Sequence, residues 1–429
     1  MIRLRISRTI HFTVRGASIG HVRHYSNKLQ QEAFLREYKI RSSLERHIYY
    51  YASKPLSKFS IQRLYDQSQK LSPTFILQNA SETIEYLLAY NARRLKEFRN
   101  LPYLVVLNPS ISESYNSYLQ TMSSLITASL NTPTTLKENS EFAEKVLTEF
   151  IDIHSDTLPS LSKGFNEVIN FLPYTKIKEF LDAHLRERIS MRLIAHQHIQ
   201  LTKALDTKDY EKGGKYNGVI KLLDINEVIK NNAEMVNGIF LMKYDQSVPI
   251  EIDNNLYSKN YWSRSEPDLD PNFKADHVKF PYIEYHLDYI LMELLKNSFR
   301  AHIENKVEDP VKITIAVSQN PSFLEMRIRD KGKGISPTTL KHMFDYSFTT
   351  FESVEGEAYK TINVPPGMGN AVAGMGYGLP LSKSYIEIFN DTIPQQLDED
   401  FDDKKVKGSL SVQTYHGWGT DVYLKTVGS

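Results

Sequence analysis

Glu293-Leu-Leu-Lys-Asn297-Ser-Phe-Arg300-Ala, at residues 293–301, is the stretch from which the fold of this chain can be read. At about 100° per residue, the apolar side chains at 287, 290, 291, 294 and 295 share one broad face of a helix. Tyr289, Glu293, Asn297 and Arg300 form a separate stripe, with Lys296 at its edge. A carboxylate, an amide and a guanidinium therefore project from one side of an otherwise buried helix. Alone this is weak evidence, because a polar stripe is usually the solvent-facing side of a helix.

Three glycine-rich stretches follow that helix. An alternating strand over 323–330 ends in Asp330-Lys-Gly332-Lys-Gly334, where glycine lets a flat ligand approach the backbone and Asp330 offers an acceptor for an exocyclic amine. Gly374-Met375-Gly376-Tyr377-Gly378-Leu379 opens a new helix and exposes N–H groups to phosphate. Gly419-Thr420 leads into the last strand. A dinucleotide-binding fingerprint is the weaker interpretation, because its glycines come early in a parallel βαβ unit and these come late in an antiparallel pattern.

The pattern of the whole chain predicts two domains, which also suits 429 residues. Residues 26–205 read as a bundle of helices separated by prolines, with long periodic segments over 137–170 and 176–202. Residues 206–429 begin with a polar, Gly-rich junction. They continue with helices at 224–243, 285–305 and 379–389 among alternating strands at 311–317, 323–330, 409–415 and 420–426. We expect one largely antiparallel sheet with helices on one face, interrupted by a charged insertion at 390–408.

Composition excludes several classes of protein. The chain has no cysteine, so disulfide scaffolds, thiol catalysis and cysteine zinc sites are ruled out. No run approaches the ~18 apolar residues of a membrane span, and a formal charge of +1 gives no basic field for nucleic acid. Residues 1–25 hold five arginines and no acid, with apolar residues at every fourth position from Ile2 to Val14. This composition is typical of a mitochondrial transit peptide, with cleavage expected after Tyr25 and the mitochondrial matrix as the destination.

In combination, ExxxN on a helix, DxGxG, GxGxGL and GT resemble the Bergerat ATP-binding α/β sandwich of gyrase, Hsp90-type chaperones, MutL and histidine kinases. More closely, the chain resembles the mitochondrial protein kinases of 2-oxoacid dehydrogenase complexes. The segments Arg93 to Pro102, Asn108-Pro109-Ser110 and Arg186 to Arg192 with His198 carry that likeness into the helical half. The resemblance therefore implies an α plus α/β architecture over nearly the whole chain.

The resemblance also implies roles for individual residues. Glu293 would orient or deprotonate the substrate hydroxyl, Asn297 would hold Mg²⁺ beside the ATP phosphates, and Asp330 would bind the adenine amine with Thr420 behind it. The other expected nucleotide contacts are Arg300, Gly332, Gly334, Thr349, Thr350 and residues 374–379, namely Gly374, Met375, Gly376, Tyr377, Gly378 and Leu379. Met343, Asp345 and Phe348 are candidate K⁺ ligands, because a similar segment binds potassium in the branched-chain member.

Three departures from the family pattern stand out. Tyr289 occupies the place where pyruvate dehydrogenase kinases have a histidine, and we do not give it the histidine's role of tuning Glu293. The Asp-Trp tail that cross-links some dimers is not matched before Ser429, which puts that mode of activation in doubt. The 390–408 insertion has no counterpart in the pattern.

The substrate expected from the resemblance is a serine of the pyruvate dehydrogenase α subunit, whose phosphorylation inactivates the complex. The branched-chain complex is the main alternative. The lipoyl domain of the acyltransferase core and a second copy of this chain, forming a homodimer, are the other expected partners.

Three further functions are disfavoured. A true histidine kinase needs a phosphoacceptor, and neither His196-Gln-His198 nor His154 is followed by the expected acidic residue, Arg and Pro. These histidines are better explained by packing or hydrogen bonding, although His154 could contribute to the phosphoacceptor end of the cleft. A gated ATPase needs a transducer domain that nothing after Thr426 supplies. A scaffold without activity is hard to reconcile with intact Glu293, Asn297 and Asp330.

Overall fold

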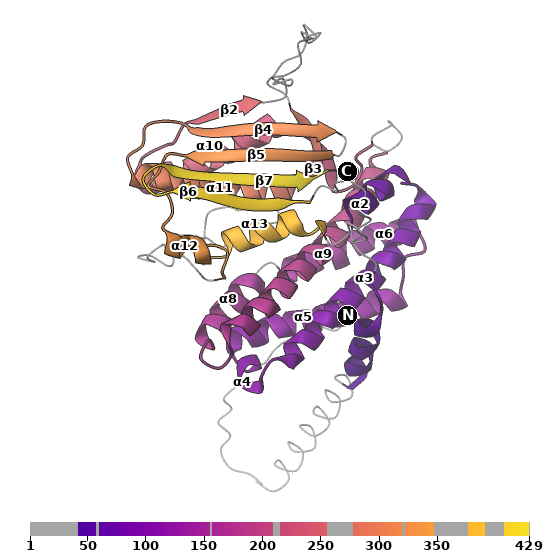
Figure 1. Cartoon of the computed structure of the whole chain (residues 1–429). Helices are drawn as coiled ribbons and strands as arrows, with labels where there is room; N and C mark the ends of the chain where they lie inside the picture. Colours follow the sequence, from indigo (N-terminus) through magenta and orange to yellow (C-terminus); the bar gives the residue numbers. More distant parts are fainter. Residues whose placement is uncertain are drawn as a thin grey trace, which may run out of the picture.

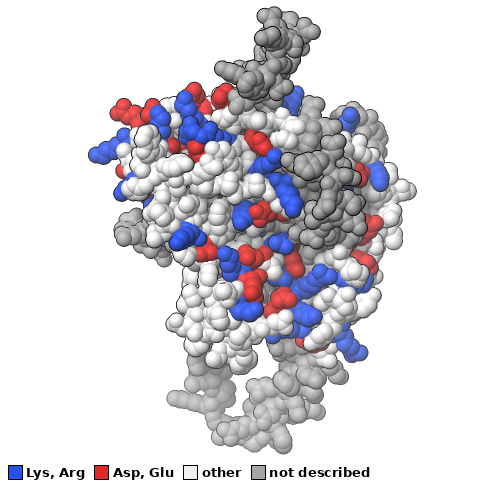
Figure 2. All heavy atoms as spheres, in the orientation of Figure 1, with Lys and Arg blue, Asp and Glu red and all other residues white. Residues whose placement is uncertain are grey.

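The computed structural model describes residues 42–56, 60–154, 157–208, 215–254, 278–319, 322–346, 376–390 and 407–428. A helical half and an α/β half lie side by side, with the long helix α9 running along their boundary (Figure 1). Acidic and basic side chains are interspersed over the described residues of the face drawn in Figure 2, so that face carries no broad field of one sign.

The helical half is built around three long helices that pack against one another. These are α3 (Pro73–Asn100), α5 (Pro109–Leu130) and α9 (Tyr174–Asp206). Two of them begin at strong caps, because the Ser72 hydroxyl accepts from Phe75 N and the Asn108 side chain accepts from two N–H groups. The shorter elements are a helical stretch at 42–53, α2 (Ile61–Gln69), α4 (Tyr103–Val106), α6 (Leu136–Glu141), a π-helical turn (Phe142–Leu147), α7 (Thr148–Ile153) and α8 (Thr157–Glu167).

The periodic segment predicted over 137–170 is broken rather than continuous, which corrects the expectation of one long segment. After the π-helical turn, α7 ends at Ile153, and side chains from elsewhere bind the carbonyl oxygen that follows. The His154 carbonyl accepts from Thr157 Oγ1 and from Arg188 Nη2, each at 3.0 Å. These two donors take the place of the backbone N–H that a continuing helix would offer, and a separate helix, α8, begins at Thr157.

A five-stranded sheet forms the α/β half, in the order β2-β4-β5-β7-β6. Its strands are β2 (Ile250–Asn254), β4 (Val311–Gln319), β5 (Ser322–Asp330), β6 (Ser409–Tyr415) and β7 (Gly419–Val427). Only the β2–β4 pair is parallel, so the sheet is largely antiparallel, as predicted. Strands β1 (Ile220–Asp224) and β3 (Lys279–Ile283) form a separate antiparallel pair.

Helices cover one face of this sheet (Figure 1). They are α10 (Ile225–Tyr244), α11 (Glu284–Glu304) and α13 (Gly378–Glu387), while α12 (Pro337–His342) lies near the sheet's β6 end. The leucines and isoleucine of α11 that were predicted to share a face are all buried, at 1% exposure or less. Helix α13 contacts both α11 and α9, so it lies where the α/β half meets the helical half.

Asn390 joins the two ends of the charged insertion through hydrogen bonds to Gly408. The Asn390 side chain accepts from Gly408 N at 2.9 Å and donates to Gly408 O at 2.8 Å, as a neighbouring strand would. Residues 391–406 of the predicted insertion (390–408) lie outside the described residues, as do residues 1–25 and residues 209–214 of the predicted junction between the domains.

Candidate functional site

Asp330, the last residue of β5, lies at a buried end of the sheet with 6% exposure. One of its oxygens, Oδ1, accepts from Gly332 N at 2.9 Å and from Thr420 N at 3.1 Å. Burial nevertheless outweighs these two hydrogen bonds and raises the pKa of the Asp330 carboxyl to about 6. Because the backbone holds Oδ1, the orientation of the carboxylate is set and Oδ2 remains to accept from a ligand.

The loop after Asp330 packs closely against the β6–β7 hairpin. Gly334 has a φ of +76°, and a Cβ there would meet the Tyr415 carbonyl oxygen at 2.5 Å. The hydroxyl of Thr414 accepts from Ile335 N at 2.8 Å and lies 3.3 Å from the hydroxyl of Thr420. A glycine is therefore required at 334, and the predicted residues Asp330, Gly332, Gly334 and Thr420 are brought together in one place.

The polar stripe of α11 faces the same region from the helix side. Glu293 forms an ion pair with Lys296, and the two side chains are only 15% and 19% exposed. Asn297, one turn further on, is exposed, whereas Arg300 pairs with Glu304 at 2.5 Å. At the other end of the stripe, burial and then the charge of Glu293 raise the pKa of Tyr289, whose ring packs 5.3 Å from that of Tyr385.

The start of α13 meets α11 at Glu293. Gly378 is the first residue of α13, and a Cβ on it would collide with the Glu293 carboxylate. Helix α13 has no side-chain cap among the described residues, and a helix N-terminus of this kind is suited to an anion. The structure thus joins two motifs that are far apart in the sequence, a carboxylate and a helix N-terminus.

Several predicted site residues cannot be placed. Phe348, Thr349, Thr350, Gly374 and Met375 lie outside the described residues. Of the other candidate K⁺ ligands, Met343 is buried, and both oxygens of Asp345 are already engaged. Its Oδ1 pairs with Lys178 at 2.9 Å and its Oδ2 with His342 at 2.8 Å.

The histidines of the bundle are packed side chains. Both ring nitrogens of His198 lie within 2.9 Å of the amides of Asn79 and Asn139, and burial lowers its pKa to about 3. His154 is hydrogen-bonded to Thr121 inside the bundle, and His196 packs on the ring of Tyr285. No nitrogen of His198 is available to accept a phosphoryl group, so the packed interpretation holds for it.

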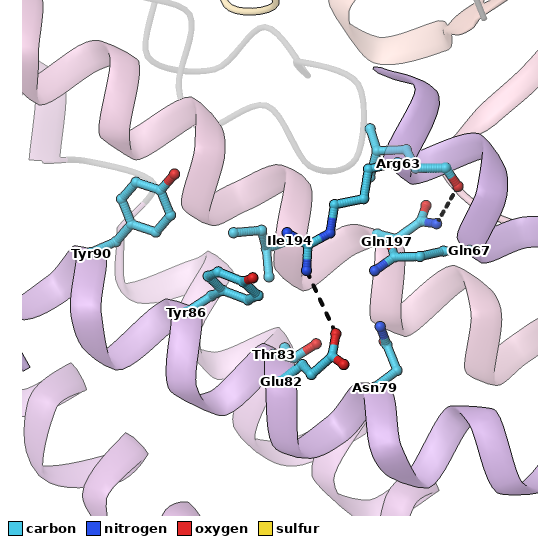
Figure 3. A pocket seen from close by; sticks show the side chains of 10 residues that line it. Arg63, Gln67, Asn79, Glu82, Thr83, Tyr86, Tyr90, Ile194 and Gln197 are labelled. Carbon is cyan, nitrogen blue, oxygen red and sulfur yellow. Dashed lines mark hydrogen bonds and ion pairs between the residues drawn. The ribbon is translucent and has the colours of Figure 1, made fainter. Parts of the chain in front are cut away.

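A small polar pocket in the helical half is separate from this site. Residues from α2, α3 and α9 line it, among them Arg63, Glu82, Tyr86 and Gln197 (Figure 3). Arg63 pairs with Glu82 at 3.6 Å across its mouth. None of the predicted site residues lines this pocket.

The described residues contain no group of three or more His, Cys, Asp or Glu side chains placed to hold a metal ion. Within the same residues, no helix is both long and apolar enough to cross a bilayer.

Sequence reasoning missed three features of the site. It did not pair Glu293 with Lys296, and it did not bring Gly378 against Glu293. It also missed Lys178 of α9, which reaches Asp345 from the other half of the molecule. The i, i+3 spacing of Glu293 and Lys296 was a usable signal for the first, whereas the other two contacts join distant segments.

Two family models match the chain. The model described as mitochondrial branched-chain alpha-ketoacid dehydrogenase kinase matches residues 58–221, and that of the histidine kinase-, DNA gyrase B-, and HSP90-like ATPase matches residues 283–426. These matches confirm the predicted fold class, a helical domain followed by an ATP-binding α/β sandwich.

Similar proteins extend the match over most of the chain. Mitochondrial pyruvate dehydrogenase (acetyl-transferring) kinase 1 of Saccharomyces cerevisiae is 32% identical over 93% of this chain and 91% of its own length. The Arabidopsis thaliana kinase is 26% identical over 78% of this chain and 80% of its own length. Isozyme 1 of Rattus norvegicus is 23% identical over 78% of this chain and 70% of its own length.

Proposed function

This chain belongs to the family of mitochondrial pyruvate dehydrogenase kinases, and we propose that it uses MgATP to phosphorylate, and so inactivate, the pyruvate dehydrogenase complex. It is an ATP-dependent protein kinase, and the expected phosphoacceptor is a serine of the α subunit. We place it in the mitochondrion, and propose the matrix as its compartment.

The close approach of Gly378 to Glu293 is the observation that carries this proposal. It sets a carboxylate beside the helix N-terminus that would bind the ATP phosphates. In the reaction, the serine oxygen would attack the terminal phosphorus, the bond to ADP would break, and Glu293 would take the hydroxyl proton. The Lys296 ammonium pairs with Glu293 and so helps to hold that carboxylate in place.

Asp330 supports the choice of ATP. Its Oδ1 is held by two backbone N–H groups, which leaves Oδ2 to accept from the exocyclic amine of adenine. Guanine has a carbonyl oxygen at that position, which would face a carboxylate oxygen. The site therefore favours adenine by a donor–acceptor match.

Asn297 fits the role of Mg²⁺ ligand. Its amide is exposed one turn beyond Glu293, and an amide oxygen together with phosphate oxygens is a donor set that Mg²⁺ accepts. When bound, Mg²⁺ would neutralise charge on the phosphates. For K⁺, the engagement of both Asp345 oxygens means that a site at 343–348 would have to rely on carbonyl oxygens rather than on that carboxylate.

The lipoyl domain of the acyltransferase core and a second copy of this chain are the partners that we propose. Each is carried by family membership rather than by a surface described above. Gel filtration of the purified chain, with and without an isolated lipoyl domain, tests both.

The test of the function is ATP-dependent phosphate incorporation into purified pyruvate dehydrogenase and branched-chain dehydrogenase complexes, side by side. Glu293→Gln and Asn297→Ala should abolish incorporation, whereas Lys176→Met, on the outer side of α9, should not. Labelled serine on the pyruvate dehydrogenase α subunit supports the proposal. Label on the branched-chain complex alone, which the family model over 58–221 makes a real alternative, would change the substrate and keep the chemistry. Acid-labile label on the kinase alone would refute both.

A further inference from the structure

A short turn at 343–346 is held between α9 of the helical half and α13 of the α/β half. Towards α13, the Phe344 ring lies 5.2 Å from the Lys383 ammonium, and the Tyr346 ring lies 5.3 Å from that of Tyr377. Towards α9, both Asp345 and Tyr346 form polar contacts. The turn is therefore a direct link between the two halves.

The contacts on α9 come from one stripe of the helix. Tyr174, Lys178 and Asp182 are spaced by four residues, so they follow one face. The Tyr174 hydroxyl accepts from Tyr346 N at 3.1 Å, Lys178 pairs with Asp345 at 2.9 Å, and Asp182 Oδ1 accepts from the Tyr346 hydroxyl. We call these three residues the α9 stripe.

Tyr346 connects α9 to the residues that precede α13. It is 5% exposed, and its hydroxyl donates to a carboxylate, which is a stronger bond than one between neutral groups. The ring that it packs against, Tyr377, is fully buried and immediately precedes Gly378. Since Gly378 lies against Glu293, a continuous series of contacts runs from Asp182 through Tyr346 and Tyr377 to the candidate site.

We propose that Asp182 is a positioning residue for nucleotide binding, acting through Tyr346 to hold Tyr377 and the N-terminus of α13 against Glu293. This inference rests on the proposed function, because it assigns the α13 N-terminus to the ATP phosphates. A residue of the helical half thereby sets the geometry of a site that is built entirely from the other half. Asp182 is itself exposed, but it bonds the buried Tyr346 hydroxyl. Lys178 contributes less, because it is 42% exposed and pairs with Asp345, which His342 also holds.

The test compares Asp182→Ala, Tyr346→Phe and the double variant with the wild-type chain, because alanine removes the oxygen that accepts from the Tyr346 hydroxyl. We expect each single variant to bind ATP about five- to tenfold more weakly, because a hydrogen bond to a charged group is lost. The KM for ATP should rise while the KM for the protein substrate stays constant. The double variant should be no weaker than either single variant, since both break the same bond. Lys178→Met should change affinity about twofold or less.

Lys176→Met is the matched control, because Lys176 pairs with Glu179 on the same helix, and both side chains are more than 60% exposed. Hydrogen exchange without nucleotide provides an independent readout at Leu381, whose N–H donates to the Tyr377 carbonyl at 2.9 Å. Faster exchange there in Asp182→Ala, together with weaker ATP binding, supports the inference. If the wild-type chain binds ATP and the Asp182 variant shows the same ATP affinity and the same exchange rate at Leu381, the inference is overturned, even if the variant melts at a lower temperature. A wild-type chain that binds no ATP would instead refute the proposed function, and with it the nucleotide role of Asp182.

Discussion

Replacing Asp330 by Asn should make the protein more stable and unable to bind ATP. Burial raises the pKa of Asp330 from 3.8 to about 6, so the native state disfavours the charged carboxylate that neutral pH imposes. Each pH unit between the two pKa values is worth about 1.4 kcal/mol, which amounts to a penalty of about 3 kcal/mol. Asparagine removes this penalty, and its Oδ1 can still accept from Gly332 N and Thr420 N.

The sign of the pH dependence follows from linkage. A raised native pKa means that the native state binds the proton more tightly than the unfolded chain, so the contribution of Asp330 is favourable at low pH and is lost as the pH rises towards 6. The advantage of Asp330→Asn should therefore be full above pH 6, shrink below it, and vanish near pH 3.8. Comparison of variant and wild type at each pH cancels the titration of all other groups.

Urea unfolding between pH 8 and pH 5, followed by circular dichroism, measures this difference. We expect the variant to gain about 1–3 kcal/mol at pH 8 and to lose the thermal stabilisation that MgATP gives the wild type, because the asparagine NH₂ group would face the adenine amine. Asp253→Asn, an exposed position of β2, is the control and should change stability by less than about 0.5 kcal/mol. A variant less stable than the wild type at pH 8, or one that still binds ATP, would refute the reasoning.

Three further predictions concern other parts of the molecule. Gly378→Ala should reduce phosphate incorporation at least tenfold, because its methyl group meets the Glu293 carboxylate, and a variant with more than half of the wild-type activity would contradict that contact. Burial lowers the pKa of His154 and of His198 to about 3, below the unfolded value near 6.5. The free energy of unfolding, measured with urea, should therefore be at its full value above pH 6.5 and fall as the pH drops towards 3, by up to about 1.4 kcal/mol per histidine and pH unit. A flat profile from pH 7 to 5 would argue that these histidines are not buried in the neutral form. His198→Leu should lower the free energy of unfolding by about 2–4 kcal/mol, because the buried side-chain oxygens of Asn79 and Asn139 each lose a hydrogen-bond partner. His416→Leu, at an exposed position, should leave the free energy of unfolding nearly unchanged.

Local periodicity predicted the elements that lie around the site. Strands β5 and β7 alternate strictly because one face is covered by helices, and α11 shows its buried stripe because that stripe faces the sheet. The clustering of Asp330, Gly332 and Thr420 was predicted by motif, and the register explains it, since Asp330 is the direct partner of Thr420.

Contacts between distant segments could not be predicted in the same way. Strand β2 pairs in parallel with β4, and β1 pairs with β3, across stretches that contain whole helices, so neither pairing leaves a local signal. The hydrogen bond between Tyr346 and Asp182 likewise joins two halves that each fold on their own pattern. The break at His154 depends on Arg188 reaching a carbonyl group from another helix.

The pair of hydrogen bonds between Asn390 and Gly408, at the base of the insertion, has a consequence for protein engineering. Because Asn390 bonds both backbone groups of Gly408, the two ends of the intervening segment are held together whatever their separation along the chain. For a flexible loop with its ends held in this way, doubling the length costs only about 0.6 kcal/mol of closure entropy. A fluorescent reporter or affinity tag grafted between 391 and 406 should therefore leave β6 and α13 in place.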